Sequence, residues 1–195
     1  MITIYSSGTT KGVRRPVQRK WSEIEDQIDV ISSEFKVWSW LINLVFKIEV
    51  ILPLDHIFGI TVKGILDKKG YKYKLHYNLL KAKPTGNVLI TTPRLAKIYF
   101  RRGYRPSIWV SGSEPIDFIV PKGIRVFQGY GLSETGIIAY NNPLGITHSD
   151  SVGKPIVEFK IIQEVLWVKP HGTWINTKDL VELDSRGYLY ITGRQ

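Results

Sequence analysis

The sequence of 195 residues contains no cysteine, which excludes disulfide bonds and thiolate catalysis. It also lacks a long apolar run. The most apolar stretch, Val37 to Phe46, is followed by Lys47 and Glu49 and is too short to cross a bilayer. The N-terminus lacks the basic flank and apolar core of a signal peptide. These absences predict a soluble cytoplasmic protein that does not span a membrane.

Acidic residues are few relative to basic ones. The chain has 17 aspartate and glutamate residues against 27 lysine and arginine residues, a formal net charge of +10. This charge predicts an anionic partner, which could be a nucleotide, a nucleic acid or an acidic surface. Hydrophobic residues make up 43% of the chain and charged residues 23%, which is the balance of a globular protein and excludes disorder as its class.

Helices and strands are expected to alternate over the first 150 residues. A capping box at Ser22 and Glu25 predicts the start of a helix. Further helices are predicted over 57–69 and 93–102. Strands are predicted over 2–5, 48–54, 71–77, 87–92, 107–112 and 124–128. This alternation predicts the α/β class, with a mostly parallel sheet flanked by helices and ligands bound at the carboxyl ends of its strands.

After residue 150 the predicted elements are short strands without helices between them. They cover 158–163, 164–169, 173–176, 180–183 and 188–192. The sequence "DSRG" at 184–187 predicts a hairpin turn. We therefore expect two units, an α/β core over residues 1–150 and a small antiparallel β subdomain over residues 151–195.

Residues 2–13, "ITIYSSGTTKGV", begin as a short strand and continue into hydroxyls, glycines and a lysine. Such a loop can cradle phosphate, because glycine lets backbone N–H groups approach an anion and lysine adds positive charge. It does not match the G-x-x-x-x-G-K-[ST] pattern of a Walker A loop. The alternative is a Ser/Thr-rich turn near the chain terminus. The candidate phosphate-binding residues are Ser6, Ser7, Gly8, Thr9, Thr10 and Lys11.

Several further stretches, taken with this loop, resemble the adenylate-forming enzymes: the acyl-CoA synthetases, the luciferases and the adenylation domains of peptide synthetases. They occur in the order of that family and cover nearly the whole chain. The matching stretches are "YSSGTTKGV" (5–13), "LPLDHIFG" (52–59), "SGSEPI" (111–116), "FQGYGLSETG" (127–136), "SVGKPI" (151–156) and "NTKDLVELDSRGYLYITGR" (176–194).

The resemblance implies an ATP-dependent acid–thiol ligase. In such an enzyme a carboxylate attacks the α-phosphorus of ATP, an acyl-adenylate forms and pyrophosphate leaves. The chemistry depends on positioning and charge neutralisation more than on a protein nucleophile. The implied cofactors are ATP or AMP and Mg²⁺, with CoA as a candidate thiol acceptor. The implied partners are a nucleotide and a carboxylic acid, whose identity the sequence does not indicate.

The resemblance also assigns roles to individual residues. The opening loop would hold the β- and γ-phosphates, and Ser133 would reach the α-phosphate. Glu134 would hold Mg²⁺, which favours carboxylate oxygen and substrate phosphates. Asp179 would accept from both ribose hydroxyls, and the β subdomain would thereby complete the ribose site. Arg194 would donate to one of these hydroxyls.

The same resemblance places the adenine and the acid. Tyr130, followed by Gly131, would stack on adenine, and His56 would lie beside the acyl carboxylate. The expected catalytic residues are Glu134, Lys11 and His56. The other face of the adenine would be lined by Gly112, Ser113, Glu114 and Pro115.

Each assignment has a structural alternative. Glu134 could be an acid at a helix N-terminus, and Asp179 could be a turn residue. Tyr130 could belong to the core, and His56 could be a packed histidine. The remaining histidines are assigned no chemistry: His76, His148 and His171.

The sequence departs from the family pattern at two sites. The loop lacks the usual G-x-P before Lys11, and the family's T-G-D reads Thr177-Lys178-Asp179. The resemblance also implies that the family's N-terminal region and C-terminal domain lie outside this sequence. An exposed apolar surface at 37–46 is therefore expected, with a partner chain or a second copy covering it.

Two other function classes remain as alternatives. One is a non-catalytic nucleotide-binding module, a fragmentary or degenerate relative that needs a partner chain. The other is a basic nucleic-acid binder, which has less support because no aromatic RNP signature occurs.

Overall fold

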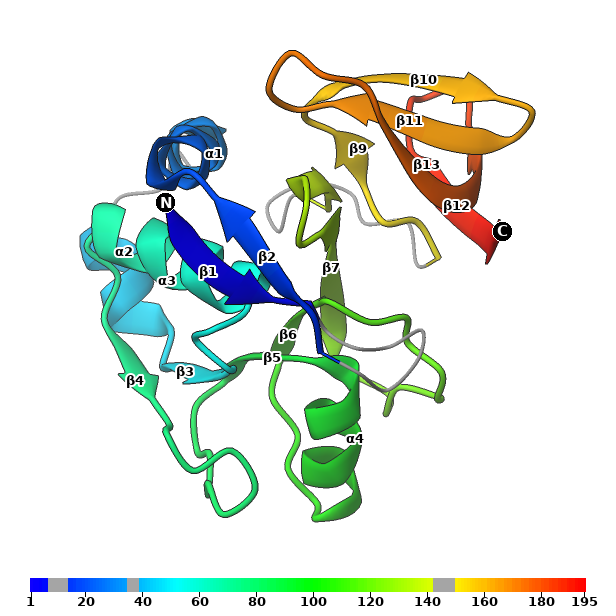
Figure 1. Ribbon diagram of the computed structural model, residues 1–195. Helices are drawn as coiled ribbons and strands as arrows, with labels where there is room; N and C mark the ends of the chain where they lie inside the picture. The colour runs from blue at the N-terminus through cyan, green and yellow to red at the C-terminus, as the bar shows by residue number, and fades with distance from the viewer. Residues whose placement is uncertain (7–13, 35–38, 142–149) are drawn as a thin grey trace.

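The computed structural model describes residues 1–6, 14–34, 39–141 and 150–195. Within these ranges the strands form sheets of seven, four and two strands (Figure 1). The two-stranded sheet is an antiparallel hairpin of β1 (Ile2–Tyr5) and β2 (Pro16–Arg19). No helix in these described ranges is long and apolar enough to cross a membrane.

The seven-stranded sheet has the order β4-β3-β5-β6-β7-β8-β9. Neighbouring strands from β4 to β7 run parallel, whereas β8 and β9 pair antiparallel. The predicted α/β class with a mostly parallel sheet is confirmed. The strands are β3 (Ile48–Ile51), β4 (Tyr73–Leu75), β5 (Val88–Thr91), β6 (Ile108–Gly112), β7 (Arg125–Leu132), β8 (Gly136–Tyr140) and β9 (Lys154–Pro155).

Helices cover both faces of this sheet, which explains why its central strands are apolar without alternation. On one face, Val50 and Ile90 pack against Phe58 of α3. On the opposite face, Leu89 and Trp109 pack against α4. Helix α1 lies over α3 and the β1–β2 hairpin (Figure 1). The helices are α1 (Trp21–Glu34), α2 (Ser39–Val45), α3 (Ile57–Lys68) and α4 (Pro93–Arg101).

The four-stranded sheet is antiparallel, and it packs on the β8 side of the large sheet. Ile138 and Ala139 of β8 share a core with Leu166 and Val181 of the small sheet. The predicted hairpin turn occurs after β12, where the Gly187 N–H donates to the carbonyl of Asp184. The strands are β10 (Glu158–Ile162), β11 (Val165–Lys169), β12 (Ile175–Leu183) and β13 (Leu189–Arg194).

Some predicted elements differ from the structure. The strand expected over 124–128 continues to Leu132, because β8 folds back and pairs with it. The strands expected over 173–176 and 180–183 form one strand in the structure, because β12 runs from Ile175 to Leu183 without the expected break. The residues between the two expected strands adopt an irregular backbone rather than a turn. The β1–β2 pairing and the elements α2, β8 and β9 were not predicted.

Helix α2 falls within the apolar run at 37–46. Its side chains contribute exposed apolar surface, with Trp40 60% and Leu44 76% exposed. The expected exposure is therefore observed for the described part of the run. A partner chain or second copy on this face stays a prediction. The boundary at residue 150 also stays a prediction, and β9 of the large sheet lies just beyond it.

Candidate functional site

The carboxyl ends of the parallel strands bring several candidate residues together. His56 follows β3 and begins α3, Ser113 follows β6, and Tyr130 lies near the end of β7. A small pocket opens between these strand ends, as expected for a parallel α/β sheet. Its lining residues are His56, Ile57, Phe58, Ser113, Gly129, Tyr130, Gly131, Gly136 and Ile137.

Asp179 meets Tyr130 where the small sheet packs on the large one. The Tyr130 hydroxyl donates to Oδ2 of Asp179 at 2.5 Å, and Nε of Arg194 lies 3.6 Å from Oδ1. Asp179 and Arg194 are register partners on β12 and β13. Asp179 is only 5% exposed, and this burial raises its pKa, although the Tyr130 hydrogen bond and the Arg194 charge act in the opposite direction. The predicted adenine and ribose residues thus form one contact group around a buried carboxylate.

His56 is buried at the N-terminus of α3. Its Nδ1 accepts from the backbone N–H of Phe58 at 3.4 Å and lies 3.3 Å from Oγ of Ser113. With Nδ1 as an acceptor, the ring proton belongs on Nε2, which is buried and has no hydrogen-bond partner among the described residues. Burial lowers the pKa of His56, and the nearby Arg14 lowers it further, while Asp55 raises it. The neutral ring therefore keeps a free N–H donor inside the structure.

Ser133 and Glu134 lie in the turn between β7 and β8. Ser133 is buried, and its Oγ donates to the carbonyl of Tyr5 at 3.5 Å, at the end of β1. Glu134 is exposed. The turn that contains Glu134 leads into a strand, so the alternative of a helix N-terminus does not apply to this residue.

The start of the candidate phosphate loop is held across the hairpin. The backbone N–H of Ser6 donates to the carbonyl of Arg15 at 2.9 Å, and Oγ of Ser6 accepts from the Arg15 N–H at 2.9 Å. The remaining candidate residues of this loop lie outside the described residues: Ser7, Gly8, Thr9, Thr10 and Lys11. The hairpin brings the start of the candidate loop beside Ser133.

No family model matches the chain. A 2-succinylbenzoate–CoA ligase from Oceanobacillus iheyensis is 25% identical over 245 aligned positions, which cover 98% of this chain and 49% of the ligase. Among solved structures, o-succinylbenzoate CoA synthetase from Bacillus subtilis superposes with a TM-score of 0.69 at 22% identity, over 99% of this chain and 49% of that chain. The ATP-bound MatB structure from Rhodopseudomonas palustris gives a TM-score of 0.72 at 18% identity, over 98% of this chain and 47% of that chain.

These matches show that the chain has the fold of adenylate-forming enzymes. Its relatives are acyl-CoA and aryl-CoA ligases, and this chain spans about half of their length. The synthetase from Bacillus subtilis has been solved with ATP and magnesium ion and with AMP.

The Lys178 departure from the adenylate-forming pattern has a visible consequence. Lys178 adopts φ 64, a left-handed conformation that glycine adopts without strain and that a lysine does not. The side chain of Asn176 supports this backbone, because its Oδ1 accepts from the Lys178 N–H at 2.7 Å. Thr177 holds the backbone of Asp179, since its Oγ1 accepts from the Asp179 N–H at 3.1 Å. The side chains of Asn176 and Thr177 thus hold the strained backbone that carries Asp179.

Only some residues of the turn after β6 face the pocket. Gly112 fits closely, because a Cβ there would lie 2.7 Å from the ring of Phe58. Ser113 adopts φ 77, and its Oγ faces His56. The Glu114 carboxylate instead accepts from the Arg94 N–H at the start of α4, at 3.3 Å, and Pro115 is exposed. Glu114 thus caps a helix in this structure.

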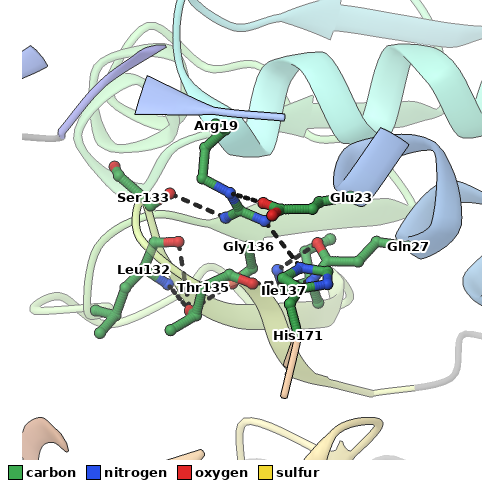
Figure 2. Close-up of polar contacts among 9 residues, drawn as sticks. All are labelled: Arg19, Glu23, Gln27, Leu132, Ser133, Thr135, Gly136, Ile137 and His171. Atoms are coloured by element: carbon green, nitrogen blue, oxygen red, sulfur yellow. Dashed lines mark hydrogen bonds and ion pairs between the residues drawn. The ribbon is translucent and has the colours of Figure 1, made fainter. Parts of the chain in front are cut away.

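Sequence reasoning missed Arg19 and Gln27, which contact the turn that carries Ser133 and Glu134 (Figure 2). Arg19 lies in a basic stretch, "RRPVQRK", in which nothing marks one arginine as buried. For Gln27, the one signal in the sequence that it contacts another part of the molecule was its polar side chain on the apolar face of α1.

Proposed function

We propose that this chain is the AMP-binding core of an acyl-CoA-synthetase-like ligase that activates a carboxylic acid with ATP. The observation that carries the proposal is the buried Asp179 carboxylate, which contacts Tyr130 and faces Arg194 at the carboxyl end of a parallel sheet. A ribose presents two hydroxyl donors, and a carboxylate can accept both. Residues 1–150 would hold the nucleotide phosphates and base, and residues 151–195 would complete the ribose site.

The nucleotide contacts follow from this placement. The Tyr130 ring would stack on adenine beside Gly131, with Gly112, Ser113, Glu114 and Pro115 along the other face. Asp179 would exchange the Tyr130 hydroxyl for ribose hydroxyls. Arg194 would donate to the ribose, and Ser133 to the α-phosphate. The described start of the phosphate loop, Ser6, lies in the hairpin that contacts Ser133 through Tyr5.

Magnesium fits the site only together with nucleotide phosphates. Among the described residues, no group of three or more His, Cys, Asp or Glu side chains could hold a metal ion. Glu134 offers one exposed carboxylate, which is enough for an ion that keeps its waters and binds mainly to phosphate oxygens. Mg²⁺ would neutralise charge on the phosphates, and Lys11 would add to this.

His56 suits the acid-binding role through its free donor. A neutral imidazole with an unpartnered Nε2–H can donate to a carboxylate oxygen without an ion pair. The carboxylate oxygen would attack the α-phosphorus, and the bond from that phosphorus to pyrophosphate would break. CoA is the thiol acceptor that the names of the relatives suggest for the second step.

Calorimetric titration with AMP and ATP, with and without Mg²⁺, tests the proposal. Because hydrogen bonds to a charged group are worth about 1.5–3 kcal/mol and neutral ones about 0.5–1.5 kcal/mol, Asp179→Ala should lose more AMP affinity than Ser133→Ala. Asp117→Ala, which removes an exposed carboxylate paired with Lys97, should change nothing. Undetectable binding of both nucleotides at millimolar concentration would refute the proposal.

A further inference from the structure

Arg19 is a buried cation that joins three parts of the molecule (Figure 2). Its Nε donates to Glu23 on α1 at 2.9 Å, and one terminal nitrogen donates to the carbonyl of Ser133 at 3.1 Å. The other terminal nitrogen lies 3.1 Å from Nε2 of His171, which precedes β12. Because a guanidinium can only donate, this histidine nitrogen must accept. Arg19 therefore ties the turn before Glu134 to both α1 and the small sheet.

Gln27 holds the other side of the same turn. Its Nε2 donates to the carbonyl of Thr135 at 2.8 Å, and its Oε1 accepts from the Ile137 N–H at 3.1 Å. The side chain also fills the space over Gly136, where an added Cβ would lie 2.0 Å from Oε1. Gly136 adopts φ 75, so the tight turn and the buried amide fit together.

These contacts place Glu134 between two fixed carbonyl groups. Arg19 binds the carbonyl of the preceding residue, and Gln27 binds the carbonyl of the following residue. Both anchors are buried, with exposed fractions of 3% and 6%, whereas Glu134 itself is exposed. The turn is therefore restrained from within while its carboxylate stays available to solvent.

We propose that Arg19 and Gln27 are positioning residues that aim the Glu134 carboxylate at the magnesium ion of a bound MgATP. The inference rests on the proposed role of Glu134 as a magnesium ligand. A single carboxylate contributes to such a site only if its backbone is held in place, because the phosphates supply the rest of the coordination. Buried hydrogen bonds to the two flanking carbonyls provide that restraint.

The test compares metal-dependent and metal-independent nucleotide binding in the full chain. Gln27→Met keeps the length of the side chain and removes both hydrogen bonds to the turn. Loss of residues that orient a metal ligand typically costs about 10- to 100-fold in metal affinity, so we expect the Mg²⁺-dependent gain in ATP affinity to fall by about tenfold or more. AMP affinity measured in the presence of a chelator should stay within about twofold of the wild-type value, because Glu134 has no metal ion to bind under those conditions.

A matched control is available in Asn87, at the amino end of β5. Its amide also accepts one backbone N–H, from Lys47, and donates to one carbonyl, of Val45. Asn87→Leu should leave both titrations unchanged. Arg19→Lys keeps the charge, but all its donors lie on one nitrogen and cannot span the three partners that the guanidinium reaches, so it should reduce the Mg²⁺-dependent gain without abolishing it.

A double variant separates positioning from general loosening. Once Glu134→Gln has removed the carboxylate, Gln27→Met should produce no further loss of the Mg²⁺-dependent gain. Equal losses of AMP and MgATP affinity in Gln27→Met, or no loss in either, would overturn the positioning role while leaving the nucleotide site intact. A wild-type chain that binds ATP equally with and without Mg²⁺ would refute the magnesium role of Glu134 and the positioning role together.

Discussion

Replacing Asp179 with asparagine should weaken nucleotide binding without weakening the fold. The side chain keeps its shape, and an amide oxygen can still accept from the Tyr130 hydroxyl. The buried carboxylate has a raised pKa because burial disfavours its charge. Asparagine removes that cost, so the free energy of unfolding near neutral pH should stay unchanged or rise by about 1 kcal/mol.

The effect on binding should be opposite in sign. Ribose hydroxyls would lose a charged acceptor, which is worth about 1.5–3 kcal/mol, or about 10- to 100-fold in AMP affinity. The amide also presents one N–H₂ group, which cannot accept. The loss of affinity should therefore appear even though the variant is as stable as the wild type.

The pH dependence gives a second measure of the same group. A folded pKa above the ordinary value of 3.8 means that the folded state favours the protonated carboxyl. Asp179 therefore contributes stability at low pH that is lost as the pH rises through the folded pKa. As the pH rises from the ordinary value to the folded pKa, Asp179→Asn should become more stable relative to the wild type. Above the folded pKa, the difference in stability should stay constant.

Urea unfolding followed by tryptophan fluorescence, together with calorimetric titration of AMP, measures both effects. Asp117→Asn, whose carboxylate is exposed beside Lys97, should change neither. A variant that loses more than about 2 kcal/mol of stability would contradict the reasoning, because the carboxylate would then be a structural anchor. Unchanged AMP affinity in Asp179→Asn would contradict the proposed contact between Asp179 and the ribose.

Two further predictions concern the fold. Glu49 is buried, accepts from the backbone N–H groups of Thr85 and Gly86, and pairs with His76, so Glu49→Leu should cost about 3–5 kcal/mol in urea unfolding. The exposed Glu158→Gln should change stability by less than about 0.5 kcal/mol in the same assay. Burial alone would raise the pKa of Glu49, but hydrogen bonds outweigh it and lower the pKa below 4.5, so this contribution should be lost in acid as the pH falls through the lowered pKa. Lys178→Gly should raise the unfolding free energy by about 0.5–1 kcal/mol in the same assay, since φ 64 strains lysine; a loss of stability would contradict this.

The sheet was predictable because its central strands and covering helices carry local patterns. Val88 to Thr91 is a short apolar run, and Ile57 to Lys68 has an apolar face, so each could be assigned from its own residues. The β1–β2 pairing was not predictable in this way. The second strand of that hairpin, Pro16–Arg19, is polar and begins with proline, and it is stabilised by pairing with β1 and by packing against α1.

The candidate site was predictable only in part. The resemblance assigned Tyr130 and Asp179 to one nucleotide, and the structure shows them in contact although they lie 49 positions apart. It gave no sign of the restraint by Arg19, whose carbonyl partner lies 114 positions away. Such contacts depend on how β2, α1 and the small sheet come together, and no local pattern encodes that arrangement.

We expect AMP to bind with its adenine against Tyr130 and its ribose against Asp179 of the small sheet. A crystal structure of this chain with AMP tests it most directly. The adenine should lie against the Tyr130 ring, with both ribose hydroxyls about 2.5–3.0 Å from the Asp179 carboxylate and Arg194 beside them. Adenine density at any other place, or a ribose without contact to Asp179, would contradict the claim.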